Sequence, residues 1–177
     1  FKNASAAFGA AKGEDSLYND ATWAVTYVDS HDYGPDGQEK TRYQGGASAW
    51  AENMDLMFTF RGIPCIYYGS EIEFKKDVPI DVGPNAPLDK TGRAYFGDHL
   101  EGSVTASDYG KYTASGTVAS TLDAPLSKHL EKLNQIRRAV PALQKGQYTT
   151  DSNYVSGNMA YIRRYTNSSV DSLACVT

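Results

Sequence analysis

The chain has 177 residues, of which 41% are hydrophobic and 12% aromatic, as is usual for a packed globular protein. Its 21 acidic residues outnumber its 17 basic residues, and the net charge of −4 argues against a nucleic-acid-binding protein. No apolar run approaches the roughly 18 residues of a membrane span, so we expect neither a transmembrane helix nor a membrane partner.

In chain order, an Ala-rich helix over residues 1–14 precedes the first strongly apolar segment. Residues 23–28, WAVTYV, are aromatic and β-branched with almost no polar face, which predicts a strand buried on both faces of a parallel sheet. Residues 29–32, DSHD, follow directly, and ligands of parallel α/β folds bind at the carboxyl ends of strands. Position alone does not separate a binding site from a capped, solvated loop start.

A helix and a second strand are predicted next. Apolar residues at helical spacing give residues 47–60 one apolar face, made by Ala47, Trp50, Met54 and Met57. Gly62 is suited to end that helix, and residues 63–68, IPCIYY, form a second short apolar run. Strand, polar loop, helix and strand in this order indicate a βαβ unit.

A long polar stretch separates this unit from another helix. Residues 75–124 are rich in Gly, Pro and Asp, and a loop of that length is usually functional or an insertion. The helix after it carries Pro125 in its first turn, with Asp123 as its cap, and we expect Pro141 and Gly146 to stop it. Its apolar stripe consists of Leu126, Leu130, Leu133, Ile136 and Val140.

The pattern changes near residue 147. Residues 158–165 and 170–177 alternate like half-buried strands, with a turn over 166–169 between them. Two or three strands rarely stand alone, and one βαβ unit with a helix cannot cover both faces of its strand pair. The sequence starts at Phe1 with no charged-then-apolar leader, so we expect no signal peptide in it and a piece of a larger fold.

Two other chemistries are disfavoured. Successive residues of an extended segment point to opposite sides, so Ser30, His31 and Asp32 do not converge as a nucleophile triad. A metal site formed by His31, Asp32 and His99 has no ligand spacing to mark it, and we predict no metal ligands here. Cys65 and Cys175 are predicted to be small core residues.

Two motifs resemble the α-amylase family of glycoside hydrolases. YVDSHD at residues 27–32 is similar to the family's seventh-strand signature, which ends in His-Asp. FTFRGIPCIYYGSEIEF at residues 58–74 is similar to the eighth strand, with Gly-Ile-Pro, four apolar or aromatic residues, Gly, one residue and Glu. The order of the motifs and the helix between them also match. The similarity runs over about residues 20–145, and the β region that follows resembles the start of the family's C-terminal β domain.

The resemblance implies an α/β fold class. Residues 1–146 would be the C-terminal part of a (β/α)8 TIM barrel, and residues 147–177 antiparallel strands that start a C-terminal β domain. It also implies an α-glucan cleft and a retaining mechanism with a nucleophile, a general acid and a third carboxylate. The expected function is that of a secreted α-amylase that hydrolyses internal α-1,4-glucosidic bonds of starch-like glucans.

The resemblance assigns roles to four residues. Asp32 matches the third carboxylate, which binds two hydroxyls of the reacting sugar and favours its distorted, oxocarbenium-like ring. His31 matches a histidine that hydrogen-bonds the same sugar. Asp89 and Arg93 have the spacing of an Asp and an Arg that contact donor subsites in related enzymes, although a charged surface loop explains them equally well.

Other residues near these motifs receive no catalytic role. Asp29 and Ser30 match variable or structural positions, and Glu71 matches a position that more often braces the barrel mouth. Arg42, with the Tyr after it, resembles an Arg-aromatic pair that often follows the His-Asp signature. Here a longer insert, YGPDGQEK, intervenes.

The chain departs from the family in lacking two of the three catalytic carboxylates. The family's nucleophile and general acid lie on its fourth and fifth strands, which precede both motifs, so neither is in this chain. Calcium ligands also come mostly from those earlier parts, which leaves calcium as a cofactor of the full-length enzyme and none within this segment. We therefore expect the isolated segment to be inactive and its partner to be the missing N-terminal part of the same barrel.

Three readings remain open at this stage. The chain is part of an α-amylase, part of a transglycosylase or oligosaccharide-cleaving α-glucosidase of the same family, or a non-catalytic carbohydrate-binding fragment. All share the quoted motifs. The 13 Tyr residues suit sugar binding because each offers an apolar ring and a polar tip, but they suit a Tyr-rich core as well.

Overall fold

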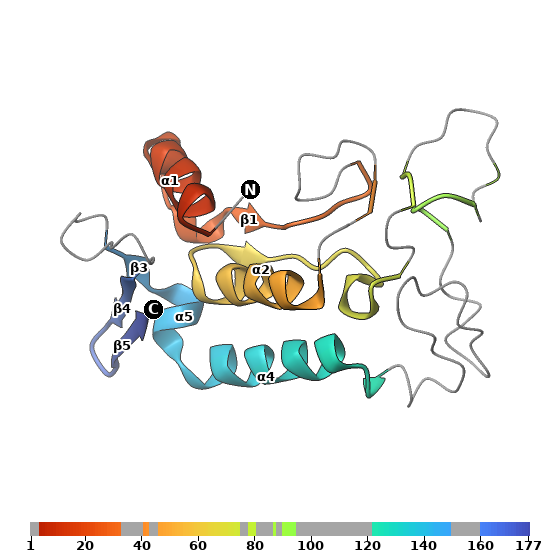
Figure 1. Cartoon of the computed structure of the whole chain (residues 1–177). Helices are drawn as coiled ribbons and strands as arrows, with labels where there is room; N and C mark the ends of the chain where they lie inside the picture. The colour runs from red at the N-terminus through yellow and green to blue at the C-terminus, as the bar shows by residue number, and fades with distance from the viewer. Residues whose placement is uncertain are drawn as a thin grey trace. The chain divides into compact units, whose positions relative to one another are not determined.

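The computed structural model describes residues 4–32, 41–42, 46–74, 78–80, 87, 90–94, 122–149 and 160–177. Its α-helices are α1 (Ala4–Glu14), α2 (Ala47–Thr59), α4 (Pro125–Ala139) and α5 (Pro141–Lys145) (Figure 1). Its strands are β1 (Val25–Thr26), β2 (Ile63–Pro64), β3 (Gln147–Tyr148), β4 (Tyr161–Thr166) and β5 (Asp171–Val176). Short 3-10 helices are η1 (Asp15–Leu17), η2 (Ala21–Trp23) and η3 (Ser70–Ile72).

The chain divides into two compact units. Unit 1 comprises Phe1–Thr26, Glu52–Cys65 and Lys132–Thr177, and unit 2 comprises Tyr27–Ala51 and Ile66–Glu131. Each unit is therefore assembled from segments that are far apart in the sequence.

Unit 1 contains the parallel strand pair that the βαβ pattern predicts. Val25 of β1 pairs with Ile63 of β2, and Thr26 pairs with Pro64. Helix α2 lies between the two strands in the sequence and ends at Thr59, one residue before the predicted end. The strands are shorter than predicted, with two residues each.

The prediction that the first strand is buried on both faces is wrong for this chain. Trp23, Val25 and Ile63 are 75%, 58% and 45% exposed. A sheet buries both faces only where further layers cover it, and the register partners Val25 and Ile63 lie on an open face. The prediction of core cysteines is wrong as well, because Cys65 and Cys175 are both exposed.

The remaining strands of unit 1 form an antiparallel sheet in the order β3-β4-β5. Strands β4 and β5 pair from Tyr161 opposite Val176 to Thr166 opposite Asp171, which confirms the predicted hairpin. Helix α5 packs against both of these strands. The aromatic rings of Phe60, Tyr148 and Tyr161 form a core cluster of this unit.

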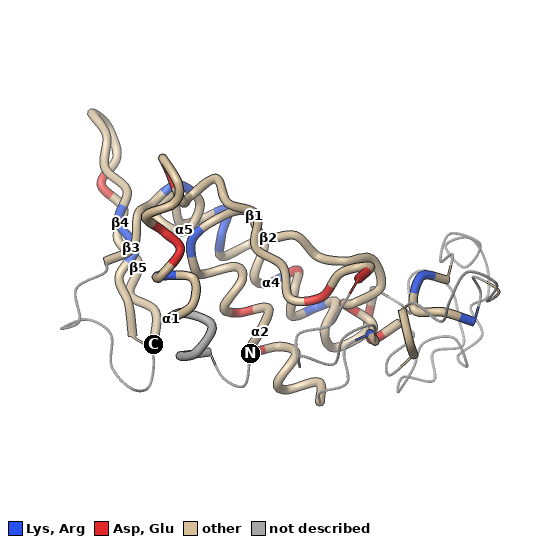
Figure 2. The backbone as a smooth tube through the Cα atoms, turned by 90° about the horizontal axis from the view of Figure 1, so that it is seen from above, with Lys and Arg blue, Asp and Glu red and all other residues tan. Residues whose placement is uncertain are grey.

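A buried arginine of β4 caps the end of α2. The Arg163 side chain is fully buried, and its Nη1 donates to the carbonyl oxygens of Thr59, at 2.9 Å, and Phe60. Its Nε and Nη2 both donate to Gly146 O, at 3.0 and 2.7 Å. The last carbonyls of a helix have no intrahelical donor, so these bonds satisfy groups that would otherwise be orphaned. Burial lowers the pKa of Arg163 to about 10. This value is still well above neutral pH, so the guanidinium stays charged there. Basic positions along β4 are blue in Figure 2.

Gly62 lets the chain pass from α2 into β2. Its φ is +96°, and a Cβ at this position would lie 2.3 Å from Ala24 O. Only glycine combines this left-handed conformation with so close an approach. The Gly62 carbonyl accepts a hydrogen bond from Arg137 Nη2 at 2.8 Å, which fixes the turn to α4.

Helices α4 and α5 follow the predicted pattern in part, since Ile136 of the predicted apolar stripe is 40% exposed. Helix α4 begins at Pro125 as expected, and Leu126 and Leu133 of its stripe are 3% and 6% exposed. Helix α4 ends at Ala139, just before Pro141 as predicted, but Pro141 also begins a further helix, α5, because the first helical position needs no N–H donor. Helix α5 ends at Lys145, before Gly146.

Unit 2 has a small core around η3. Ile72, Phe74 and Ala94 are buried together. Trp50, on the apolar stripe of α2, is 1% exposed, and its indole Nε1 donates to Ser70 O at 2.7 Å. This bond satisfies the polar atom of a buried tryptophan and ties the helix to the segment that follows β2.

Most of the predicted long loop, residues 75–124, lies outside the described residues. The predicted domain boundary between residues 146 and 147 falls where α5 gives way to β3, and the existence of a separate β domain stays a prediction. Within the described part of the chain, no helix has the length and apolar character needed to cross a membrane.

Candidate functional site

The polar segment after β1 presents its side chains in two directions. Asp29 is 3% exposed, whereas the side chains of His31 and Asp32 are 67% and 59% exposed. A short turn separates the two groups, in which the Asp32 N–H donates to Ser30 Oγ at 3.0 Å. The segment therefore offers one carboxylate to the interior of unit 2 and one to solvent.

Arg93 joins the two exposed residues of this segment. Its Nε donates to the backbone carbonyl of His31 at 2.8 Å, and its Nη2 lies 3.4 Å from Asp32 Oδ1. The other carboxylate oxygen, Asp32 Oδ2, lies 3.2 Å from His31 Nε2. The structure thus brings together three of the four site residues predicted from the sequence, and the solvent-facing side of Asp32 remains accessible to a ligand.

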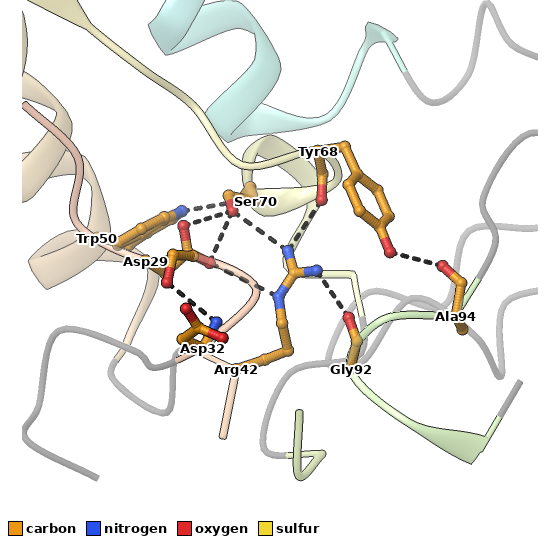
Figure 3. A network of polar contacts seen from close by, with 9 residues as sticks. Asp29, Asp32, Arg42, Trp50, Tyr68, Ser70, Gly92 and Ala94 are labelled. Atoms are coloured by element: carbon orange, nitrogen blue, oxygen red, sulfur yellow. Dashed lines mark hydrogen bonds and ion pairs between the residues drawn. The ribbon is translucent and has the colours of Figure 1, made fainter. Parts of the chain in front are cut away.

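Beneath this group lies a buried cluster, which we call the Asp29 cluster, formed by Asp29, Arg42 and Ser70 (Figure 3). The Ser70 hydroxyl lies 2.9 and 2.8 Å from the two carboxylate oxygens of Asp29. Arg42 Nε lies 3.6 Å from Asp29 Oδ2, and both side chains are almost fully buried. Buried charges are costly unless they are paired and hydrogen-bonded, and here both conditions are met.

The Arg42 guanidinium uses its remaining donors on three other groups. Nη1 donates to Gly92 O at 3.1 Å, and Nη2 donates to Tyr68 O at 3.0 Å and to Ser70 Oγ at 3.2 Å. The guanidinium also lies over the Tyr67 ring, with its carbon 4.4 Å from the ring centroid. One side chain therefore connects the segments after β1 and after β2 with the loop that carries Arg93.

The environment of the cluster changes the proton affinity of its members. Burial raises the pKa of Asp29 to about 6, and this rise persists although Arg42 and the Ser70 hydroxyl act in the opposite direction. Burial also lowers the pKa of Arg42, with Asp29 opposing the shift. The pKa of Glu71 is raised by burial.

Residues 91–94 are held from several sides. The Gly92 N–H donates to Pro79 O at 2.8 Å, and the Tyr68 hydroxyl donates to Ala94 O at 2.8 Å. The Arg93 N–H donates to Thr91 Oγ1 at 3.1 Å. A Cβ on Gly92 would come within 2.7 Å of Arg42 Cγ, so this glycine is required by close packing on the arginine stem.

Sequence reasoning found the exposed residues but missed the buried cluster. Asp89 and His99 lie outside the described residues, so their predicted roles stay predictions. Asp29 lies within the first motif and Arg42 in an Arg-aromatic pair after it, but nothing in the sequence shows that the two side chains pair. Glu71 lies in η3, where its backbone carbonyl accepts a hydrogen bond from Ser127 at 3.4 Å.

No protein-family model and no curated protein sequence matches the chain. Solved structures do match. A variant of trehalulose synthase MutB aligns with a TM-score of 0.54 over 95% of this chain at 18% identity. Another variant, in complex with Tris, gives 0.52 over 89% of this chain at 18% identity. An inactive double mutant in complex with isomaltulose gives 0.51 over 95% at 19% identity.

The chain has the fold of the matching part of this enzyme. At 18% to 19% identity, these matches show a shared fold. The chain spans 35% to 37% of the length of the three matched structures.

Proposed function

We propose that the chain is part of a retaining α-amylase-family enzyme that cleaves α-glucosidic bonds, with Asp32 as its transition-state-stabilising carboxylate. The observation that carries this proposal is the placement of Asp32. Its carboxylate is largely exposed, and its two oxygens lie beside His31 and Arg93. It follows a strand of a parallel pair, at the end where ligands of α/β barrels bind.

In this proposal Asp32 accepts hydrogen bonds from two hydroxyls of the reacting sugar. These bonds strengthen as positive charge develops on the ring, and together they supply several kcal/mol of transition-state stabilisation. His31 donates to the same sugar from the adjacent position. Arg93, whose guanidinium lies beside Asp32, contacts the sugar or holds the carboxylate, and Asp89 serves the neighbouring donor subsite.

The nucleophile and the general acid come from barrel elements outside this chain. The open face at Val25 and Ile63 supports this view, because apolar residues of a parallel strand pair are normally covered by neighbouring strands and helices. We therefore propose the remaining part of the barrel as the partner of this segment. The isolated chain should accordingly be inactive.

For substrate and setting we retain the expectation from the motifs. The proposed substrate is a starch-like α-glucan cut at internal α-1,4 bonds, and the proposed location is extracellular. Among the described residues, no group of three or more His, Cys, Asp or Glu side chains is placed to hold a metal ion. Calcium is retained as a proposed cofactor of the complete enzyme, and no chemical step is routed through it.

A second candidate is a transglycosylase or isomerase of the same family. The observation that favours it is the fold match to trehalulose synthase structures. Product analysis with amylose and with sucrose separates the candidates. Shortened linear maltooligosaccharides from amylose would support the amylase, and isomeric disaccharides from sucrose would support the second candidate.

The role of Asp32 is tested by Asp32→Asn in the complete enzyme. The change is isosteric and the side chain is exposed, so the fold should be retained while kcat falls at least about a hundredfold. Asp123→Asn is a matched control, because Asp123 is exposed and pairs with Lys128 at 3.0 Å, outside the proposed site. An unchanged kcat in Asp32→Asn would refute the assignment.

A further inference from the structure

Two arginine–carboxylate pairs hold the segment after β1 in unit 2. Arg42 pairs with Asp29 in the interior, and Arg93 lies beside Asp32 at the surface. Asp29 and Asp32 belong to the segment after β1, whereas Arg93 belongs to the loop that Arg42 contacts at Gly92. Asp29 thus lies three residues before Asp32 in the sequence, and Arg42 contacts Gly92, the residue before Arg93.

The loop that carries Arg93 depends on Arg42 for its position. Arg42 Nη1 binds the Gly92 carbonyl, and the stem of the same side chain fills the space beside the Gly92 Cα. Arg42 is itself fixed by Asp29, Tyr68 and Ser70. Because Arg93 follows Gly92 directly, a shift of this carbonyl moves the Arg93 guanidinium relative to Asp32.

We propose that Arg42 is a positioning residue: by holding Gly92 it sets the place of the Arg93 guanidinium beside Asp32. Asp29 and Ser70 serve the same purpose one step removed, because they orient Arg42. This inference rests on the proposed function for its catalytic consequence, but the clamp on residues 91–94 is a property of the fold and can be measured without any substrate.

The arrangement requires arginine rather than any cation. The three edges of the guanidinium face different groups, with Nε toward Asp29, Nη1 toward Gly92 and Nη2 toward Ser70. A lysine ammonium at the same place keeps the charge but not this planar fork, so it cannot serve all of these groups in their present geometry. Arg42→Lys therefore separates positioning from simple charge neutralisation.

The test combines Arg42→Lys with Arg93→Met, singly and together, in the complete enzyme. We expect Arg42→Lys to lower kcat/KM on an α-1,4-linked maltooligosaccharide about tenfold, in line with the cost of a misplaced site group. In the Arg93→Met background the same change should cost less than about twofold, because coupled residues are non-additive. An equal loss in both backgrounds would show that Arg42 does not act through Arg93.

Amide hydrogen exchange supplies the readout that needs no substrate. Arg42→Lys should speed exchange of the Gly92 amide, which donates to Pro79 O, at least about tenfold. Arg61→Lys is the matched control, since Arg61 is also buried in an ion pair, with Asp15, but belongs to unit 1. It should leave both Gly92 exchange and kcat/KM unchanged. Unchanged Gly92 exchange in Arg42→Lys would overturn the clamp.

Gly92→Ala provides a second variant if Arg42→Lys does not fold. It leaves the charges intact and pushes the loop away from the arginine stem. It should therefore also lower kcat/KM, but only weakly in the Arg93→Met background. The outcomes separate the two proposals. Faster exchange in an enzyme with no activity on any α-glucoside would refute the proposed function and keep the clamp.

Discussion

Asp29 and Arg42 form an ion pair in the interior of unit 2, with side chains that are 3% and 2% exposed and a distance of 3.6 Å between Oδ2 and Nε. Such a pair is weak evidence for stability, because removing two charges from water costs about as much as their attraction returns. It is stronger evidence for orientation. The cluster connects three segments of chain beside the proposed catalytic carboxylate, which is where fixed geometry matters most.

The pH dependence of stability should report on Asp29. Its pKa is raised by burial to about 6 in the folded protein, whereas Arg42 and Ser70 lower it and Glu71 raises it further. The folded state therefore binds this proton more tightly than the unfolded state, and the contribution of Asp29 to stability increases as pH falls from 7 to 4.5. The wild type should gain stability relative to Asp29→Asn over this range, by about 2 kcal/mol in the free energy of unfolding.

Asp20→Asn is the matched control for this titration. The Thr22 hydroxyl and N–H lower the pKa of Asp20, so its contribution is complete at pH 4.5 and above and is lost only at lower pH. The stability difference between wild type and Asp20→Asn should be flat from pH 7 to 4.5. A flat difference for Asp29→Asn as well would contradict the raised pKa.

Periodicity predicted the elements, but not the contacts between them. The βαβ order, the helix from Pro125 and the hairpin of β4 and β5 were all predicted from local patterns that persist in the structure. The Asp29–Arg42 pair could not be predicted, because a 13-residue separation with a polar insert leaves the position of Arg42 undetermined. Burial of the strand at Val25 was overestimated, because a sequence records apolar character but not what covers it.

Removing the arginine cap of α2 should destabilise unit 1. Arg163→Met keeps the apolar stem but leaves the carbonyls of Thr59, Phe60 and Gly146 without their donors. Unsatisfied buried groups cost about 1–3 kcal/mol each, so we expect a loss of about 3 kcal/mol in the free energy of unfolding, measured by urea denaturation. Arg164→Met, one residue later on β4, changes an exposed pair with Asp171 and should have a much smaller effect.

A methyl group at the turn after α2 should also be destabilising. Gly62→Ala forces alanine into a φ of +96° and brings its Cβ within 2.3 Å of Ala24 O, so we expect a loss of about 2 kcal/mol or more. Gly13→Ala in α1 is the matched control, because nothing lies within 4 Å of its added Cβ. There the better helix propensity of alanine should stabilise the protein by up to about 1 kcal/mol. Equal thermal midpoints for the two variants would argue against the close approach at Gly62.

The open face of β1 and β2 gives the most direct test of the proposed partner. By strand alternation, Cys65 lies on the same side as Ile63, whose register partner is Val25, and all three are exposed in this chain. If the remaining part of the barrel covers this face, a thiol reagent should label Cys65 readily in the isolated 177-residue chain and at least about tenfold more slowly in the complete enzyme. Peptide mass analysis after timed labelling distinguishes Cys65 from Cys175, which is also exposed. An equal labelling rate of Cys65 in the isolated chain and in the complete enzyme would mean that no barrel elements lie over this strand pair, and the assignment of a missing barrel partner would then fail while the role of Asp32 could still be judged by its own variant.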